Sequence, residues 1–191
     1  MWQTVEFGAA HEGRPGVLLA DGTEPKPVYF DTGSSGHMHQ SSDWWIYDGT
    51  LRAPLATHLR ASCACGWRGE SHYPLDWDQV DRRSPDLFDT TGLEEDWDQH
   101  IQDIEARATP LPEDLATLIE QIEQRLGNLA GDAPLAALRA ISRLEHIITD
   151  ASRRAAFHAE ADTGDGSAIG PGLGLPEREA RQRLLRYTLH H

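Results

Sequence analysis

The chain has two cysteines, Cys63 and Cys65, and they stand one residue apart in the run Cys-Ala-Cys-Gly-Trp. Cysteines this close do not easily form a disulfide bond, because the bond requires Cα atoms about 4.4–6.8 Å apart and relaxed side-chain torsions. Two thiolates followed by glycine are typical of a metal-binding knuckle, in which glycine lets backbone amides turn toward sulfur. The run therefore predicts a metal site, and the simpler alternative is a pair of small buried cysteines.

A tetrahedral zinc site has four ligands, so two thiolates need histidine or carboxylate partners. Two of the ten histidines are candidates: His58, five residues before Cys63, and His100, in the run Trp-Asp-Gln-His. We predict the zinc ligands His58, Cys63, Cys65 and His100. His72 is the alternative to His58. Four protein ligands leave no position for water, so the zinc would be structural rather than catalytic.

The segments that must position these ligands differ in type. Up to about residue 70, short apolar runs alternate with turn residues, which is typical of β-structure. Beyond it, Trp97, Ile101 and Ile104 repeat at helical spacing and predict a helix over residues 92–108 that contains His100. Strands are expected over residues 17–20, 28–30, 44–47 and 56–61, the last of which would carry His58 toward the knuckle.

Two amphipathic helices follow and predict an antiparallel hairpin. The first helix is expected to end at Gly127, and the second to begin around Pro134. A last helix is expected after Pro176. The predicted class is α+β: a small β-rich, zinc-stapled N-terminal part, an antiparallel helical hairpin, and a short C-terminal helical unit. The expected boundaries are residues 1–108, 109–160 and 161–191.

Composition restricts the function. The formal net charge of −14 over 191 residues argues against non-specific nucleic-acid binding by the whole surface. No apolar run approaches the roughly 18–20 residues that span a bilayer, so no membrane partner is expected. Two cysteines without a secretory signal favour a cytoplasmic location. The acidic residues are concentrated in residues 1–110, which have 19 Asp and Glu and 8 Lys and Arg. Residues 135–191 have 7 Asp and Glu and 8 Lys and Arg.

The order of these motifs resembles that of uncharacterised proteins of high-GC actinobacteria. Those proteins have a Trp-rich Tyr-Asp-Gly strand, a Cys-x-Cys-Gly-Trp-Arg-Gly knuckle, a Trp-x-x-His, a helical hairpin and a helix-turn-helix-like tail. The matching segments here are residues 44–49, 63–69, 97–100 and 169–180. The resemblance covers about residues 43–188 and mainly implies the architecture.

The tail also resembles the Ile-Gly-x-x-Leu-Gly-Val run and recognition helix of small bacterial DNA-binding helix-turn-helix units. The resemblance implies that Ile169, Leu173 and Leu175 are buried, that Gly174 makes the turn, and that Ala180 allows close helix packing. The DNA-binding residues would be Arg178, Arg181 and Gln182 in the groove, and Arg183 or Arg186 on the phosphates. Pro171 and several glycines stand inside the first helix, where they are unfavourable, so this segment can instead be a Gly-rich loop. The alternative for the last helix is that it docks on the hairpin with its arginines in solvent.

One run suggests an enzyme. Residues 29–35, Tyr-Phe-Asp-Thr-Gly-Ser-Ser, resemble the active-site run of aspartic proteases, in which two such aspartates share a proton. Asp31 is present in one copy, so the chain would have to dimerise through this loop. A strand that ends in a Gly/Ser turn is the favoured interpretation, and no catalysis is expected.

The sequence therefore favours a non-enzymatic, DNA-associated transcriptional regulator with a structural zinc site, and a homodimer is compatible with it. The first alternative is a zinc-stabilised protein–protein interaction module that uses the hairpin and does not bind DNA. The second is an aspartic-protease-like hydrolase that acts through Asp31.

Overall fold

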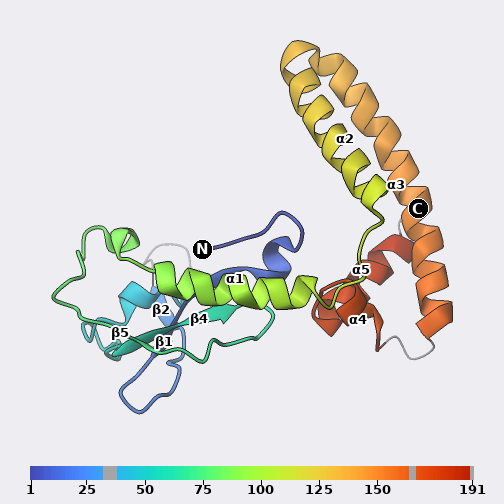
Figure 1. Ribbon diagram of the computed structural model, residues 1–191. Coiled ribbons are helices and arrows are strands. Elements are labelled where there is room, and N and C mark those ends of the chain that lie inside the picture. Colours follow the sequence, from blue (N-terminus) through green and yellow to red (C-terminus); the bar gives the residue numbers. More distant parts are fainter. Residues whose placement is uncertain (32–37, 164–166, 190–191) are drawn as a thin grey trace. The chain divides into compact units, whose positions relative to one another are not determined.

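A computed structural model describes residues 1–31, 38–163 and 167–189 of the chain (Figure 1). The chain divides into two compact units, Met1–Asp103 and Ile104–His191. The first contains small antiparallel sheets and the second consists of helices, so the predicted α+β class is confirmed. Among the described residues, no helix is long and apolar enough to cross a membrane.

The first unit is built on a three-stranded antiparallel sheet in the order β1-β4-β5. In the register of β1 with β4, Gly13 pairs with Cys63 and Leu18 pairs with His58. His58 and Cys63, two of the four predicted zinc ligands, therefore lie at opposite ends of β4. The strands are β1 Gly13–Leu18, β4 His58–Cys63 and β5 Tyr73–Pro74, and a separate antiparallel pair is β2 Val28–Asp31 and β3 Met38–Ser41.

One helix, α1 Thr91–Glu105, packs its apolar face into the core of this unit. Leu93, Trp97 and Ile101 are buried, as their spacing predicted for the last two. The Trp97 indole leaves no room for a side chain at Gly13, where a Cβ would lie 2.6 Å from Nε1 of Trp97. This glycine in β1 therefore lets the helix approach the sheet closely.

The strand expected at residues 44–47 is wrong, because Trp44–Ile46 forms a short 3₁₀ helix, η2. Trp44 and Tyr47 are both buried. A 3₁₀ helix has about three residues per turn, so positions three apart point in the same direction. A strand would have placed these two aromatic rings on opposite faces. The other 3₁₀ helices are η1 Gly8–His11 and η3 Pro85–Leu87.

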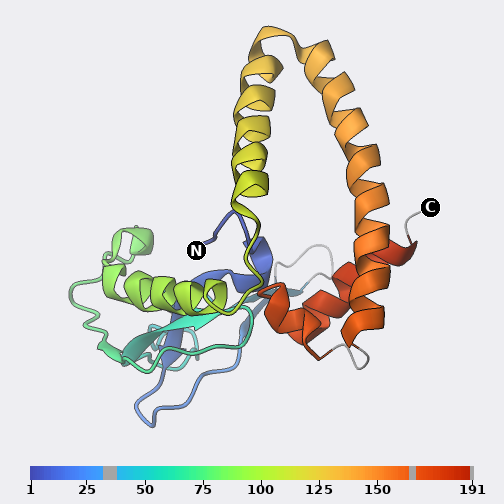
Figure 2. The same cartoon turned by 45° about the vertical axis from the view of Figure 1, so that its right-hand side comes forward.

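In the second unit, α2 Glu113–Asp132 and α3 Pro134–Thr163 form the predicted hairpin, which turns at Ala133 (Figure 2). The expected end of α2 at Gly127 is wrong. Glycine inside a helix costs only about 1 kcal/mol relative to alanine. The stronger signal is Pro134, since a residue before proline avoids the helical conformation and proline suits the first position of a helix.

The tail contains a single helical turn, α4 Ile169–Gly172, and the longer α5 Glu177–Leu189. Helix α5 packs against both α4 and α3. The hairpin and the tail therefore belong to one compact unit, whereas the sequence suggested two separate parts.

Candidate metal centre

Four side chains in the first unit bring their donor atoms together: His11, Cys63, Cys65 and His100. One ligand atom from each lies within 4.8 Å of the others. His11 ends η1, Cys63 ends β4, Cys65 stands in the following turn, and His100 lies on α1. Such a group could hold a metal ion, and it would join three separate segments of the chain.

The separations match a four-coordinate site. Sγ of Cys63 lies 3.6 Å from Nδ1 of His11, and Sγ of Cys65 lies 3.4 Å from Nε2 of His100. A tetrahedral zinc ion with Zn–S of about 2.3 Å and Zn–N of about 2.05 Å separates sulfur from nitrogen by roughly 3.6 Å. His11 and Cys63 are each only 4% exposed, and the other two ligands are half-buried.

The turn after β4 shapes the knuckle. The amide of Gly66 donates to the carbonyl of Cys63 at 3.0 Å, and the amide of Cys63 donates to the carbonyl of Trp67 at 3.0 Å. Gly66 has φ +102°, a conformation that side-chain-bearing residues rarely adopt. The amide of Trp67 then points at Sγ of Cys65 at 3.4 Å. This is the amide-to-sulfur contact that the Cys-x-Cys-Gly run indicated.

Two tryptophans hold the histidines in place. The ring of Trp67 stacks on the ring of His100, with centroids 4.2 Å apart and an interplanar angle of 5°. The indole N–H of Trp97 donates to the carbonyl of His11 at 3.1 Å. Groups around metal ligands commonly orient them in this way. Both tryptophans therefore lie beside the cluster.

The two thiols share a proton unequally. A hydrogen bond from the Cys63 thiol lowers the pKa of Cys65, and contacts with His100 and His11 lower it further. The same bond raises the pKa of Cys63, and burial adds to that rise. The hydrogen bond therefore favours the thiolate form at Cys65 over that at Cys63. Binding a metal through both sulfurs requires the release of the second proton.

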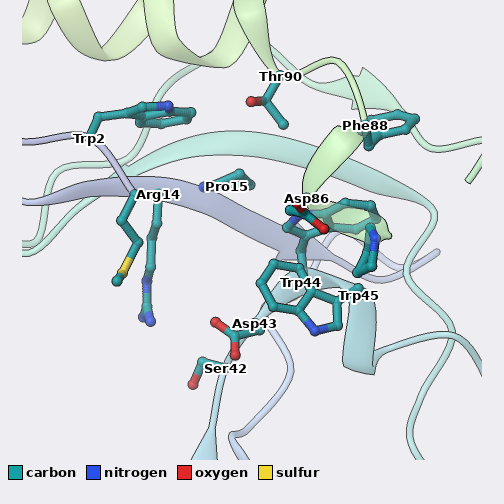
Figure 3. Close-up of a pocket in the computed structure, with 12 residues that line it drawn as sticks. Trp2, Arg14, Pro15, Ser42, Asp43, Trp44, Trp45, Asp86, Phe88 and Thr90 are labelled. Atoms are coloured by element: carbon teal, nitrogen blue, oxygen red, sulfur yellow. The ribbon is translucent and has the colours of Figure 1, made fainter. Parts of the chain in front are cut away.

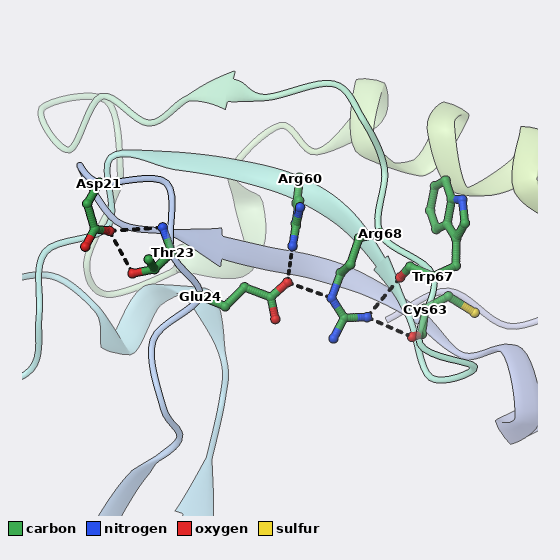
Figure 4. Close-up of polar contacts among 7 residues, drawn as sticks. All are labelled: Asp21, Thr23, Glu24, Arg60, Cys63, Trp67 and Arg68. Atoms are coloured by element: carbon green, nitrogen blue, oxygen red, sulfur yellow. Dashed lines mark hydrogen bonds and ion pairs between the residues drawn. The ribbon is translucent and has the colours of Figure 1, made fainter.

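An ion-pair network supports the knuckle from the sheet (Figure 4). Nη1 of Arg68 donates to the carbonyls of Trp67 and Cys63, at 2.9 and 3.2 Å, while its Nε donates to Glu24 at 2.7 Å. Arg60 on β4 donates to the same carboxylate. Burial alone would raise the pKa of Glu24, but the bonds from Arg68 and Arg60 lower it. The loop that contains Glu24 is thereby tied to both β4 and the knuckle.

The prediction of His58 as a ligand is corrected by this arrangement. His58 begins β4 and Cys63 ends it, so about 16 Å of extended strand separates them at ~3.3 Å per residue. Its Nδ1 lies instead 3.1 Å from the hydroxyl of Thr57. His72, the alternative, is exposed and outside the cluster. The position assigned to His58 is occupied by His11.

Sequence reasoning missed His11 because no local spacing connects it to the knuckle, 52 residues away. The connection is the pairing of β1 with β4. Gly13 lies opposite Cys63, and the amide of Ala64 donates to the carbonyl of Glu12 at 2.9 Å. A correct strand register would have pointed to His11.

The tail residues divide as the helix-turn-helix resemblance implied, with one exception. Ile169, Leu175 and Ala180 are buried, and Gly174 turns with φ +62°. Leu173 is 41% exposed and is not part of the core. Of the predicted DNA-binding residues, Arg183 is half-buried, and the exposed ones are Arg178, Arg181, Gln182 and Arg186.

Arg181 and the first helix of the tail each depart from an ideal recognition unit. Nη2 of Arg181 lies 2.5 Å from a carboxylate oxygen of Glu177. The helix before the turn, α4, has only four residues, Ile169–Gly172. The proline and glycines of that segment explain its shortness.

The proposed protease run is only partly described. Asp31 is the last residue of β2 and pairs in register with Met38 of β3. Residues 32–35, which complete the Asp-Thr-Gly-Ser-Ser pattern, lie outside the described residues.

A hollow elsewhere in the first unit is lined by aromatic rings and Arg14 (Figure 3). Its volume of about 170 Å³ is below the ~300–1,000 Å³ typical of ligand pockets. Trp44 is packed in the core beside Trp77 and Phe88. Trp44 therefore serves packing, and the His/Cys cluster is the stronger candidate site.

The cluster has the donor set of a closed structural metal site, and its geometry follows from the sheet register and α1. Comparisons of the chain with family models, with curated proteins and with solved structures find no match. Function is therefore inferred from the cluster and from the exposed surfaces, because fold alone does not specify function.

Proposed function

We propose that this protein is a non-enzymatic, DNA-associated regulator. Its N-terminal unit would be held together by a structural zinc ion, and its C-terminal unit would contact DNA through α5. The observation that carries the DNA assignment is the division of α5 into a buried face and an exposed, arginine-bearing face.

The donor set supports zinc. Two thiolates and two imidazoles suit a soft or borderline ion, whereas Mg²⁺ and Ca²⁺ prefer oxygen ligands. Four protein donors close the coordination sphere, so the ion would stabilise the fold rather than activate water. Much of its binding free energy would then be folding free energy of the first unit.

The exposed face of α5 supports DNA contact. Ala180 and Leu184 are buried, which directs Arg178, Gln182 and Arg186 outward. Helix α5 carries four arginines and two glutamates in a chain of net charge −14. Its positive face is therefore local, as expected for a protein that positions itself on phosphates through a few residues.

The ion pair of Arg181 and the exposed leucines of α5 also support DNA contact. The pair between Arg181 and Glu177 lies at the surface, and such pairs contribute little, so Arg181 can exchange its partner for a phosphate. Leu185 and Leu189 are exposed on this helix, and apolar groups can contact thymine methyl groups in the major groove.

The test compares DNA binding by the full chain, by an Arg178→Ala/Arg181→Ala variant, and by a control. Arg83→Ala is a suitable control because Arg83 is exposed and lies in the first unit. Genomic fragments retained by the protein are measured at two salt concentrations. We expect the double variant to lose about tenfold or more in affinity and to reduce the salt slope by roughly 2.

Two outcomes would overturn the DNA assignment. One is no retention of DNA by the native chain at either salt concentration. The other is equal affinity of the double variant and the Arg83→Ala control, because the contact would then not lie on α5.

A protein-interaction module is the second candidate, and the hairpin favours it. No residue of α2 is buried, and several large apolar side chains of α2 and α3 are exposed. This alternative predicts a co-purifying protein and no DNA binding.

A further inference from the structure

The α2–α3 hairpin presents an apolar surface that the described chain does not cover. Within the hairpin, only Ala137 and Ala156 are buried. Figure 2 shows α2 and α3 diverging from their corner. Eight large aliphatic side chains on the two apolar faces are 39–61% exposed: Leu115, Leu118, Ile119, Ile122, Leu138, Ile141, Ile147 and Ile148.

Near the corner, the two helices leave a groove of about 410 Å³ between them. Ile122, Leu126 and Leu129 of α2 form one wall. Ala140, Leu144 and Ile147 of α3 form the other. Arg125 and Arg143 stand among these residues. A groove of this kind accepts a ridge of apolar side chains from another helix.

Helices of this length gain most of their stability from burying an apolar face, not from intrinsic propensity. In α2 that face remains 40–52% exposed from Leu115 to Ile122. A hairpin with such a face is one half of a helical bundle, and it needs another helical surface to complete its core.

We propose that the missing surface is a second copy of this chain, and that two hairpins pair through their apolar faces into a four-helix bundle. This inference does not depend on DNA binding by α5. It commits to a symmetric dimer, in which the same patch of both copies forms the interface.

The exposed area is what a dimer requires. A leucine or isoleucine side chain contributes up to ~120 Å² of apolar surface, so eight half-exposed ones leave about 500 Å² per copy. A standard interface buries ~800 Å² per partner, of which ~65% is apolar in homodimers, or roughly 520 Å². The hairpin face therefore matches a complete dimer interface.

The charges on the hairpin also complement one another under two-fold symmetry. Helix α2 carries five acidic residues and one arginine, whereas α3 carries four arginines and four acidic residues. Between residues 135 and 154, α3 has four arginines and two acids. Bringing α2 of one copy against α3 of the other pairs an acidic helix with a basic segment, and the two-fold axis repeats that pairing.

The rest of the molecule disfavours association elsewhere. Residues 1–103 carry 18 acidic residues and 7 Lys and Arg. Residues 104–191 carry 13 acidic residues and 10 Lys and Arg. Two copies of so acidic a first unit repel each other. The second unit is the part through which two copies can meet with the least repulsion.

The experiment is sedimentation equilibrium of the full, zinc-loaded chain over a wide range of protein concentration. The expected mass is twice the 21.2 kDa of one chain. A Leu118→Glu/Ile148→Glu variant should sediment as a monomer, because it places carboxylates in the centre of both apolar faces. Both side chains are more than half exposed in the chain itself, so the substitutions should leave each copy folded, as zinc content and tryptophan fluorescence can check.

Two control variants define the site. Val5→Glu/Leu87→Glu adds the same charge at exposed apolar positions of the first unit and should remain dimeric. Leu118→Met/Ile148→Val keeps the hairpin apolar and should also remain dimeric. A native chain that is monomeric at every concentration overturns the proposal without reference to any variant. A dimer that survives Leu118→Glu/Ile148→Glu also overturns it, because the interface would lie elsewhere.

Discussion

The sheet unit and the helical hairpin differ in how far they bury their apolar side chains. In the first unit, Leu59, Trp97 and Ile101 are buried within the chain, and the His/Cys cluster joins segments that are distant in sequence. In the hairpin, a clearer apolar pattern leaves its leucines and isoleucines half-exposed. Regular periodicity therefore predicts which face is apolar, but it does not predict what covers that face.

Metal removal is expected to have the largest effect, and it should act on the first unit but not on the helical hairpin. All six tryptophans lie in residues 1–103, and the described helices α2, α3 and α5 contain none. Chelation should unfold the first unit, since structural zinc sites contribute on the order of 10 kcal/mol to folding. We expect a red-shifted tryptophan emission while most of the far-UV helical signal persists. Unchanged emission in protein shown to have lost its metal would contradict a structural role for the ion.

The next largest effect should distinguish His11 from His58 by the metal content of their alanine variants. His11→Ala should lose the proposed zinc ion, because it removes a buried donor whose Nδ1 lies 3.6 Å from Sγ of Cys63. His58→Ala is the matched control and should retain one zinc per chain, because His58 lies at the opposite end of β4. Metal content of freshly purified protein checks both. Zinc loss in His58→Ala, with zinc retained in His11→Ala, would restore the ligand set expected from sequence.

The smallest effect compares one glycine from each region. In Gly13→Ala, the new Cβ would lie 2.6 Å from Nε1 of Trp97 and 2.7 Å from the ring of Trp2, so the free energy of unfolding should fall by about 1–3 kcal/mol. In Gly127→Ala, no atom outside the adjacent backbone of α2 lies within 4 Å of the new Cβ, and the helix should gain up to ~1 kcal/mol. Denaturant titrations, followed by tryptophan emission for the first and by helical signal for the second, measure these changes. A destabilised Gly127→Ala would show that α2 is closely packed at that position.

Local patterns accounted for most of the architecture. The hairpin followed from its apolar spacing, and α1 followed from Trp97 and Ile101. Two local patterns led to wrong predictions of secondary structure. The aromatic run at residues 44–47 has the composition of a strand, yet Trp44–Ile46 forms a 3₁₀ helix, and Trp44 and Tyr47, three residues apart, are both buried. Gly127 suggested a helix end, but the following residues continue the helix as far as Asp132.

By itself the sequence determined the knuckle, the helix that carries His100, and the apolar faces of α2 and α3, because each depends on residues close together in the chain. Only the tertiary structure decided the fourth member of the His/Cys cluster. His11 reaches the site because β1 and β4 pair with Gly13 opposite Cys63, and a strand register is a long-range choice that no local spacing encodes. The same pairing placed His58 at the far end of β4, where an extended strand cannot bring it back to the two sulfurs.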